Sequence, residues 1–262
     1  MNGDVTWVGL AASLALVAVA VALSRLMALR LEREMAWAAV RALVQLVLVG
    51  WALGLVIDPS RPVVLAWAWA AAMVAYAAVV VRRRTPEIPG ILPLALVAFT
   101  AAAVVTLGVL FGLRVFPLEG RTLVPLAGMM VGNAMSATVV AARRVVELGT
   151  DRRREIEARL ALGLASRRAI RPYLAAAVRT ALIPQIETTK AVGLVFLPGA
   201  MTGLILAGVD PLDAVLVQAV VMYVVLGSLA TTTTVVALGL SRRLFTPDQR
   251  LVPLTRVADP AA

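Results

Sequence analysis

Five polar side chains could handle a cargo inside a chain that is otherwise strongly apolar. Arg41 lies about two turns into an apolar run, and Gln45 follows one turn later on the same helical face. Asn133 lies near the middle of another run, while Glu187 and Lys190 lie at the mouth of a third. Because a buried Arg is costly unless it is paired or hydrated, such groups are candidates for a substrate pathway. Snorkelling explains Arg41 equally, and helix packing explains Asn133.

Glycine and proline mark candidate packing and hinge positions. Gly128 and Gly132 form a small-residue stripe, which favours close helix packing. Pro198–Gly199 interrupts a later apolar run, and Gly199 with Gly203 forms a second close-approach pair. Broken helices in transporters often mark a site or a hinge. A simple packing kink explains the same residues.

The sequence offers few ligands for a tightly bound metal. It contains no Cys and no His, which excludes thiolate and imidazole ligands, disulfides, Cys nucleophiles and His bases. The predicted membrane spans also lack Asp and Glu, the usual oxygen ligands. Met thioethers remain, although Met in a span is usually a filler of apolar gaps. The metal ligands are therefore unknown, and a chelated or organic cargo stays open.

Transmembrane helices are the elements that must position these residues. The chain is 61% apolar and 15% charged, with a mean hydropathy of +0.92, which is typical of integral membrane proteins. The apolar runs are continuous and lack the alternation of a barrel, so helices are expected. About 20 helical residues cross a hydrocarbon core of roughly 30 Å. Seven runs qualify: Val5–Leu23, Met35–Ile57, Val63–Val81, Ile91–Phe111, Leu123–Ala142, Ala191–Val209 and Ala214–Leu240. We predict an all-α integral membrane protein with one polytopic domain over residues 1–262.

The distribution of Lys and Arg predicts the orientation. Alternating connections place 21 of the 25 basic residues on one side, including everything from Arg143 to Lys190. Such residues concentrate in cytoplasmic loops. We therefore expect a multi-pass protein of the inner or plasma membrane, with its N-terminus outside and its C-terminus in the cytoplasm. The first run lacks a basic n-region and is interpreted as a retained anchor. Orientation and membrane lipid, rather than nucleic acid, explain the net charge of +10.

One predicted cytoplasmic connection, Arg143–Lys190, is far longer than the others and is expected to be functional. Asp151 can cap a helix there, which Gly163 or the following turn can end. Ser166 opens a second helical piece, which we expect to be kinked at Pro172 and broken at Pro184. An apolar stripe at i, i+4, i+7 and i+8 predicts that the first helix is amphipathic: Ile156, Leu160, Gly163 and Leu164.

Several segments resemble a known family. Glu157–Ala158, followed six residues later by Gly163, resembles the core of the EAA-type motif of ABC transporter permeases. In those permeases this cytoplasmic helix docks into a cleft on the ATPase subunit. Residues 128–135, the sequence Leu-Ile-Pro at 182–184 and residues 192–208 closely resemble the FetB family of iron-export permeases, which also includes plant aluminium-tolerance half-transporters.

The resemblance implies the permease subunit of an ABC exporter for iron or another metal. It implies a separate cytosolic ABC ATPase subunit that holds ATP-Mg, and a homodimer of permeases with two ATPases. It also implies an ATPase-coupling site made of Glu157, Ala158, Arg159, Leu160 and Gly163. The sequence contains no phosphate-binding loop of the Gly-x-x-x-x-Gly-Lys-[Ser/Thr] type, so we expect neither enzymatic activity nor a cofactor in this chain.

Other functions remain open. An ABC permease for a chelated or organic substrate, such as a nucleotide sugar, fits the scarcity of metal ligands. A non-ABC carrier or channel coupled to an ion gradient would normally use a carboxylate within the membrane, and the predicted spans contain none. A membrane scaffold that binds anionic lipid fits the Arg clusters alone.

Overall fold

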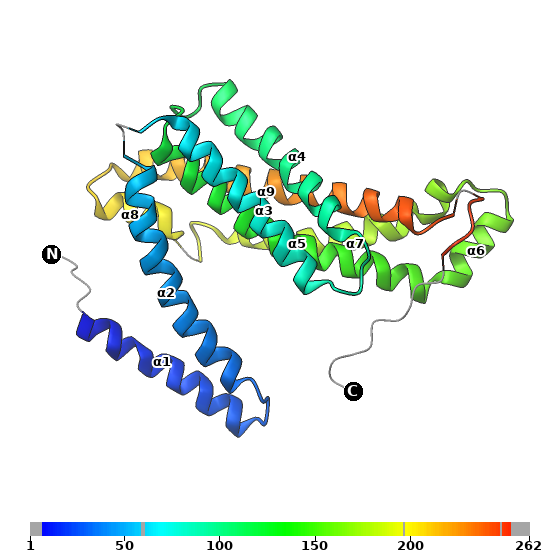
Figure 1. The fold of residues 1–262 in the computed structure, drawn as a ribbon, viewed down its shortest axis with the longest axis horizontal. Coiled ribbons are helices and arrows are strands. Elements are labelled where there is room, and N and C mark those ends of the chain that lie inside the picture. The colour runs from blue at the N-terminus through cyan, green and yellow to red at the C-terminus, as the bar shows by residue number, and fades with distance from the viewer. Residues whose placement is uncertain (1–6, 59–60, 196, 247, 253–262) are drawn as a thin grey trace. The chain divides into compact units, whose positions relative to one another are not determined.

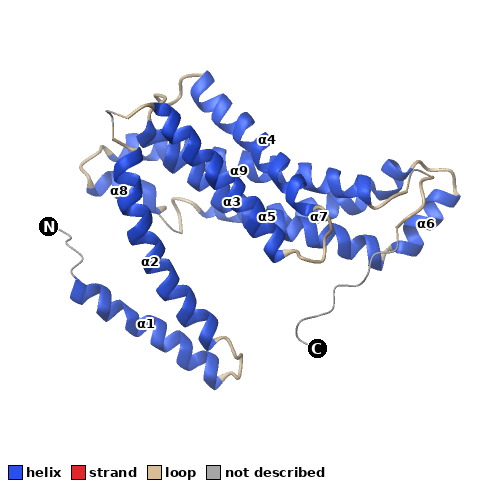
Figure 2. Cartoon of the chain, viewed as in Figure 1, coloured by secondary structure: helices blue, strands red, loops and turns tan. Residues whose placement is uncertain are grey.

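The computed structural model describes residues 7–58, 61–195, 197–246 and 248–252. In this part of the chain every regular element is a helix, as predicted (Figures 1 and 2), and one isolated antiparallel bridge joins Phe245 and Leu251. The chain divides into two units, residues 1–61 and residues 62–262. The all-α membrane class predicted from the sequence is confirmed.

The first unit is a pair of helices, α1 (Trp7–Leu26) and α2 (Glu32–Val56). A buried hydroxyl organises their connection, because Ser24 Oγ donates to Glu32 Oε1 at 3.1 Å and accepts from the Leu31 N–H at 3.2 Å. α2 is long and apolar enough to cross a membrane, whereas the apolar part of α1 is shorter. The first predicted span began at Val5, outside the described residues.

The second unit is a bundle built on α3 (Val63–Arg84), α4 (Ile91–Gly112), α5 (Gly120–Asp151) and α9 (Pro211–Arg243). α5 packs against α3 and α9, and α4 packs against α9. Alanine, valine and leucine fill the core between them. α5 and α9 contain 32 and 33 residues. At 1.5 Å per residue each is about 48–50 Å long, well beyond a hydrocarbon core of about 30 Å, so both helices project out of the membrane.

Two arginines tie the projecting helices to the connection between α3 and α4. The Arg143 guanidinium on α5 donates to the carbonyl of Arg84 and lies 3.3 Å from Glu87 Oε1. The Arg243 guanidinium on α9 donates to the carbonyl of Pro89 at 3.1 Å. The basic clusters at the ends of α3, α5 and α9 therefore share one end of this unit, as their predicted sidedness requires. We call it the arginine end.

The predicted sixth span, Ala191–Val209, is wrong as a single helix. The structure has α7 (Ser166–Ala191), a break, and α8 (Gly199–Leu206). Eight residues rise only about 12 Å, too little to cross a membrane. α7 instead runs along α5 and α9 from the arginine end, where α6 (Arg153–Ala161) lies, toward the opposite end, where α8 lies (Figure 1).

The course of α7 contradicts two further predictions. It continues through Pro184, because the buried Ala177 and Ala181 pack it into the bundle and outweigh the local cost of proline. Lys190 lies near its far end, roughly 36 Å along the axis from Ser166, and so does not join the basic cluster at the arginine end. Five described helices, α2 to α5 and α9, are long and apolar enough to span. The total of seven crossings stays a prediction.

The contact between α4 and α9 is tight at Gly239. A Cβ at this position would overlap Leu94 Cδ1, with Leu94 Cδ2 at 2.9 Å and Cγ at 3.1 Å. We expect Gly239→Ala to destabilise the bundle by about 1–3 kcal/mol, because the half-buried Leu94 side chain must shift at the contact between the two helices. Thermal unfolding in detergent measures this effect. Gly227→Ala on the same helix is the control, since its Cβ would meet Thr106 Cγ2 at an ordinary 3.8 Å. Equal stability of the two variants would contradict this packing.

Candidate functional site

The helix predicted to couple to an ATPase is α6 (Arg153–Ala161), which follows the projecting end of α5. Arg152 is the only residue between them, and it serves as the C-cap of α5 and the N-cap of α6. Asp151 belongs to α5, so the predicted capping of α6 by Asp151 is wrong. Ile156 is fully buried and anchors α6 on the second unit. α6 is thus held beyond the apolar part of the bundle.

Gly163 ends α6, as the sequence indicated. Its φ is +84°, a left-handed conformation that favours glycine. The Gly163 N–H donates to the Leu160 carbonyl at 2.9 Å, and the Leu164 N–H donates to the Arg159 carbonyl at 3.2 Å. This pair of bonds is the Schellman motif, which satisfies the last carbonyls of the helix. α7 begins only three residues later, at Ser166.

Glu155 fastens α6 to α7. Its carboxylate accepts from Arg152 Nη1 at 2.6 Å and from the Tyr173 hydroxyl at 2.9 Å. The Arg159 guanidinium lies 5.6 Å from the centre of the Tyr173 ring, a cation–π distance. The hydrogen bond from Arg152, followed by that from Tyr173, lowers the pKa of Glu155. Burial, followed by the bond to Glu155, raises the pKa of Tyr173.

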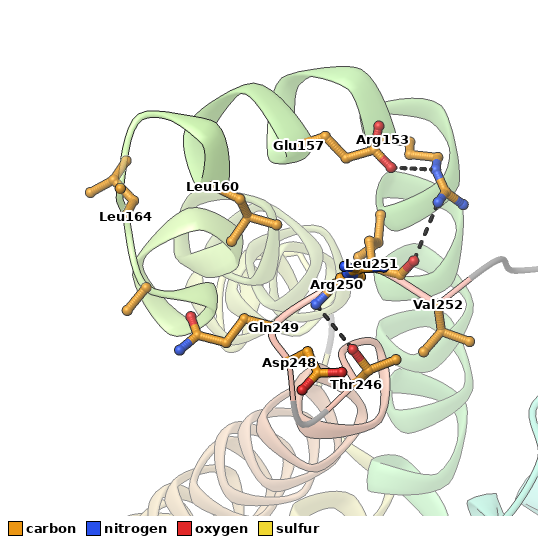
Figure 3. Close-up of a pocket in the computed structure, with 12 residues that line it drawn as sticks. Arg153, Glu157, Leu160, Leu164, Thr246, Asp248, Gln249, Arg250, Leu251 and Val252 are labelled. Carbon is orange, nitrogen blue, oxygen red and sulfur yellow. Dashed lines mark hydrogen bonds and ion pairs between the residues drawn. The ribbon is translucent and has the colours of Figure 1, made fainter.

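The predicted coupling residues divide between two faces of α6. Leu160 and Leu164 are half-buried and line a groove beside the C-terminal segment, and Glu157 pairs with Arg153 at 2.7 Å on the edge of that groove (Figure 3). The apolar stripe therefore serves partly the protein's own packing. A second face points to solvent, and it consists of Arg154, Ala158, Ala161 and Leu162.

Leu162 is a residue that the sequence analysis missed. Its side chain is 83% exposed at the C-cap of α6, outside the apolar part of the bundle. A leucine that lies off the apolar stripe of a charged helix is the signal that could have identified it. Together with the exposed Ala158 and Ala161, Leu162 forms a small apolar patch among charges, which is a candidate surface for a partner.

The substrate-pathway candidates lie in three places. Arg41 and Gln45 lie one turn apart on α2, in the first unit. Asn133 is exposed on α5, where its Nδ2 donates to the Met129 carbonyl at 2.7 Å. Glu187 and Lys190 form an exposed ion pair of 2.9 Å near the end of α7. Their role in a pathway stays a prediction.

The packing and hinge candidates also differ from one another. A Cβ on Gly128 would lie 3.6 Å from Met73 Cε, so this glycine does face α3. No described atom lies within 4 Å of a Cβ built on Gly132, Gly199 or Gly203. Any close approach at those three positions therefore involves no described residue of this chain. Pro198 is the N-cap of α8, so the interruption at Pro198–Gly199 is the boundary of a helix.

The sequence analysis also passed over Gln218 on α9. Its side chain is only 4% exposed, and its Oε1 has no hydrogen-bond partner among the described residues. Buried polar groups are normally paired, so this amide is a further candidate for a polar contact within the bundle. Among the described residues, no group of three or more acidic side chains lies close enough to hold a metal ion.

The bonds of Glu155 predict a pH-dependent fastening of α6. Because its pKa is lowered in the native state, the carboxylate stabilises the α6–α7 contact above its ordinary pKa of 4.5, and this stabilisation is lost as the pH falls through the lowered value. Titration of the Glu155 carboxyl by NMR in detergent measures the shift. Tyr173→Phe should move the pKa part of the way back, since Arg152 still donates. A Glu155 that titrates at its ordinary value would contradict the contact.

Comparison with known proteins places the chain among membrane proteins. Residues 7–245 match the "Uncharacterised protein family (UPF0014)". The chain is 39% identical to "UPF0014 membrane protein STAR2" of Oryza sativa subsp. japonica, over 83% of this chain and 76% of that protein. It is 31% identical to "Probable iron export permease protein FetB" of Escherichia coli (strain K12), over 97% of each. It is 34% identical to "Protein ALUMINUM SENSITIVE 3" of Arabidopsis thaliana, over 83% and 80%.

No solved structure matches this chain. The match to the family nevertheless extends from the start of α1 to Phe245, two residues beyond α9, and so includes both units and α6. The chain is a multi-pass membrane protein and belongs to the UPF0014 family.

Proposed function

We propose that this chain is the permease subunit of an ABC exporter and that a separate cytosolic ATPase subunit drives it. The observation that carries the proposal is the exposed face of α6, which presents Ala158, Ala161 and Leu162 between charged residues. A short helix with small apolar residues and a charged rim suits a cleft on a partner protein. The name of the Escherichia coli relative, a probable iron export permease, supports the assignment as an export permease.

The connections of α6 suit the transmission of movement. α6 is joined to α5 through Arg152 alone, and Glu155 fastens it to Tyr173 on α7. The Ile156 side chain of α6 is fully buried against the rest of the second unit. A displacement of α6 by a nucleotide-dependent partner would therefore move α5 and α7 with it, because packed elements shift as rigid bodies. ATP-Mg would be held by the partner.

Exposed polar side chains support a second copy of the permease. Asn133 and Ser136 are exposed on α5, and Thr180 and Thr188 are exposed on α7. Asn133, Thr180 and Thr188 each donate to a carbonyl of their own helix. Polar surface is still less favourable against lipid than against protein or a water-filled path. A homodimer that pairs with two ATPases would place these groups at an interior surface. The same surface would form the pathway of the cargo.

We propose iron or another metal as the cargo, moved out of the cytosol, in line with the name of the Escherichia coli relative. The absence of an acidic cluster among the described residues favours a second candidate, a chelated or organic substrate. Inside-out vesicles containing the permease and its ATPase distinguish the two. Uptake of free Fe²⁺ that depends on ATP supports the first candidate, and uptake of a chelate alone supports the second.

Leu162→Asp tests the docking face. We expect it to weaken association with the ATPase subunit about tenfold or more, because a buried apolar anchor commonly contributes over 1 kcal/mol to an interface. Each ABC ATPase of the source organism is co-expressed in turn, and co-purification and permease-stimulated ATP hydrolysis are measured. The thermal stability of the variant should not change, since the side chain is 83% exposed.

Leu113→Asp is the matched control. Leu113 is also a helix C-cap, 74% exposed, but it follows α4 at the end of the bundle away from the arginine end. It should leave the association unchanged. Full binding and full stimulation by Leu162→Asp would refute a coupling role for α6.

A further inference from the structure

A groove of about 900 Å³ separates α6 from the C-terminal segment. One wall is formed by α6 and the turn after it, with Glu157, Leu160 and Leu164. The other wall is formed by Thr246 and residues 248–252 (Figure 3). We call residues 244–246 and 248–252 the C-terminal turn. The groove adjoins the proposed docking face, because Gly163 in its wall directly follows Leu162.

The C-terminal turn has a defined conformation. Its Leu244 and Leu251 side chains are buried. The Val252 N–H donates to the Leu244 carbonyl at 2.9 Å, and the Thr246 N–H donates to the Arg250 carbonyl at 2.8 Å. The Arg250 N–H donates in return to Thr246 Oγ1 at 3.1 Å. These bonds hold the backbone of the turn in a defined shape.

Two hydrogen bonds cross from the α6 side to this turn. Arg153 Nη2 donates to the Leu251 carbonyl at 3.3 Å (Figure 3), and the Ser166 N–H donates to Gln249 Oε1 at 3.1 Å. The C-terminal turn is therefore attached to α6 and to the start of α7. Asp248 and Arg250 are exposed, and neither side chain forms an ion pair within the described residues.

We propose that the C-terminal turn is a second docking element, which receives a projecting segment of the same ATPase subunit in the groove. This inference rests on the proposed function. The partner segment that fits is apolar at its centre, to meet Leu160 and Leu164, and carries an acidic side chain toward Arg250 and a basic one toward Asp248. The arginine end is strongly basic, so an acidic partner surface is complementary to it. An anionic lipid surface fits less well, because Glu157 and Asp248 line the groove and would repel it.

Reversal of the two exposed charges tests the proposal. We expect the double variant Asp248→Lys/Arg250→Glu to weaken association with the ATPase about tenfold, while its net charge stays that of the natural chain. The control is Glu187→Lys/Lys190→Glu, a charge reversal that also keeps the net charge and lies at the exposed ion pair near the far end of α7. It should leave the association unchanged.

The natural absence of cysteine allows a second measurement that needs no loss of binding. Asp248→Cys, labelled with a photoactivatable cross-linker, should form an adduct with the ATPase. Lys190→Cys, labelled in the same way near the far end of α7, should not.

The outcomes separate this inference from the function on which it rests. Weakened binding by Leu162→Asp, with full binding by the double variant and no adduct at residue 248, would overturn the second docking element and leave the coupling role of α6 intact. Full binding by both variants would overturn both. A double variant that loses affinity only for vesicles of anionic lipid would assign the turn to the membrane surface and would also overturn the inference.

Discussion

The guanidinium groups of Arg143 and Arg243 hold the ends of the second unit together. Arg143 donates to the carbonyl of Arg84, the last residue of α3, where a helix leaves its carbonyls without internal partners, and Arg243 donates to the carbonyl of Pro89, just before α4. These bonds tie α5 and α9 to the same short segment at the point where both leave the bundle. The position of α6, of the start of α7 and of the C-terminal turn follows from this arrangement, because all three extend from the ends of α5 and α9.

Hydropathy predicts most of the helices well because every membrane-spanning helix must be apolar over the length that contacts lipid. The runs at Val63–Val81 and Ile91–Phe111 match α3 and α4 within a few residues. Hydropathy did not predict that the helix opening at Ser166 continues to Ala191 and packs against α5 and α9, because α7 contains many polar and basic residues. Hydropathy also predicted a span at Ala191–Val209, because hydropathy averaged over a window does not detect the backbone break at Val192 and Gly193.

The site could be predicted in outline only. The spacing of Ile156, Leu160 and Gly163 predicts a helix and its end, because both depend on local backbone geometry. It does not tell which side of the helix the bundle covers. Ile156 turned inward and Leu162 outward because α7 and the C-terminal segment, distant in sequence, occupy the space on one side. Gln249 and Leu251 entered the site through such long-range contacts, and no local pattern marks them.

The unbroken course of α5 has a mechanical consequence. It contains Pro125 but remains one helix of 32 residues from Gly120 to the joint at Arg152. A rod about 48 Å long that tilts by about 10° around its middle moves each tip by about 4 Å in opposite directions. The displacement of the Gly120 end then equals that of the end beside α6, because the helix has no break between its two ends.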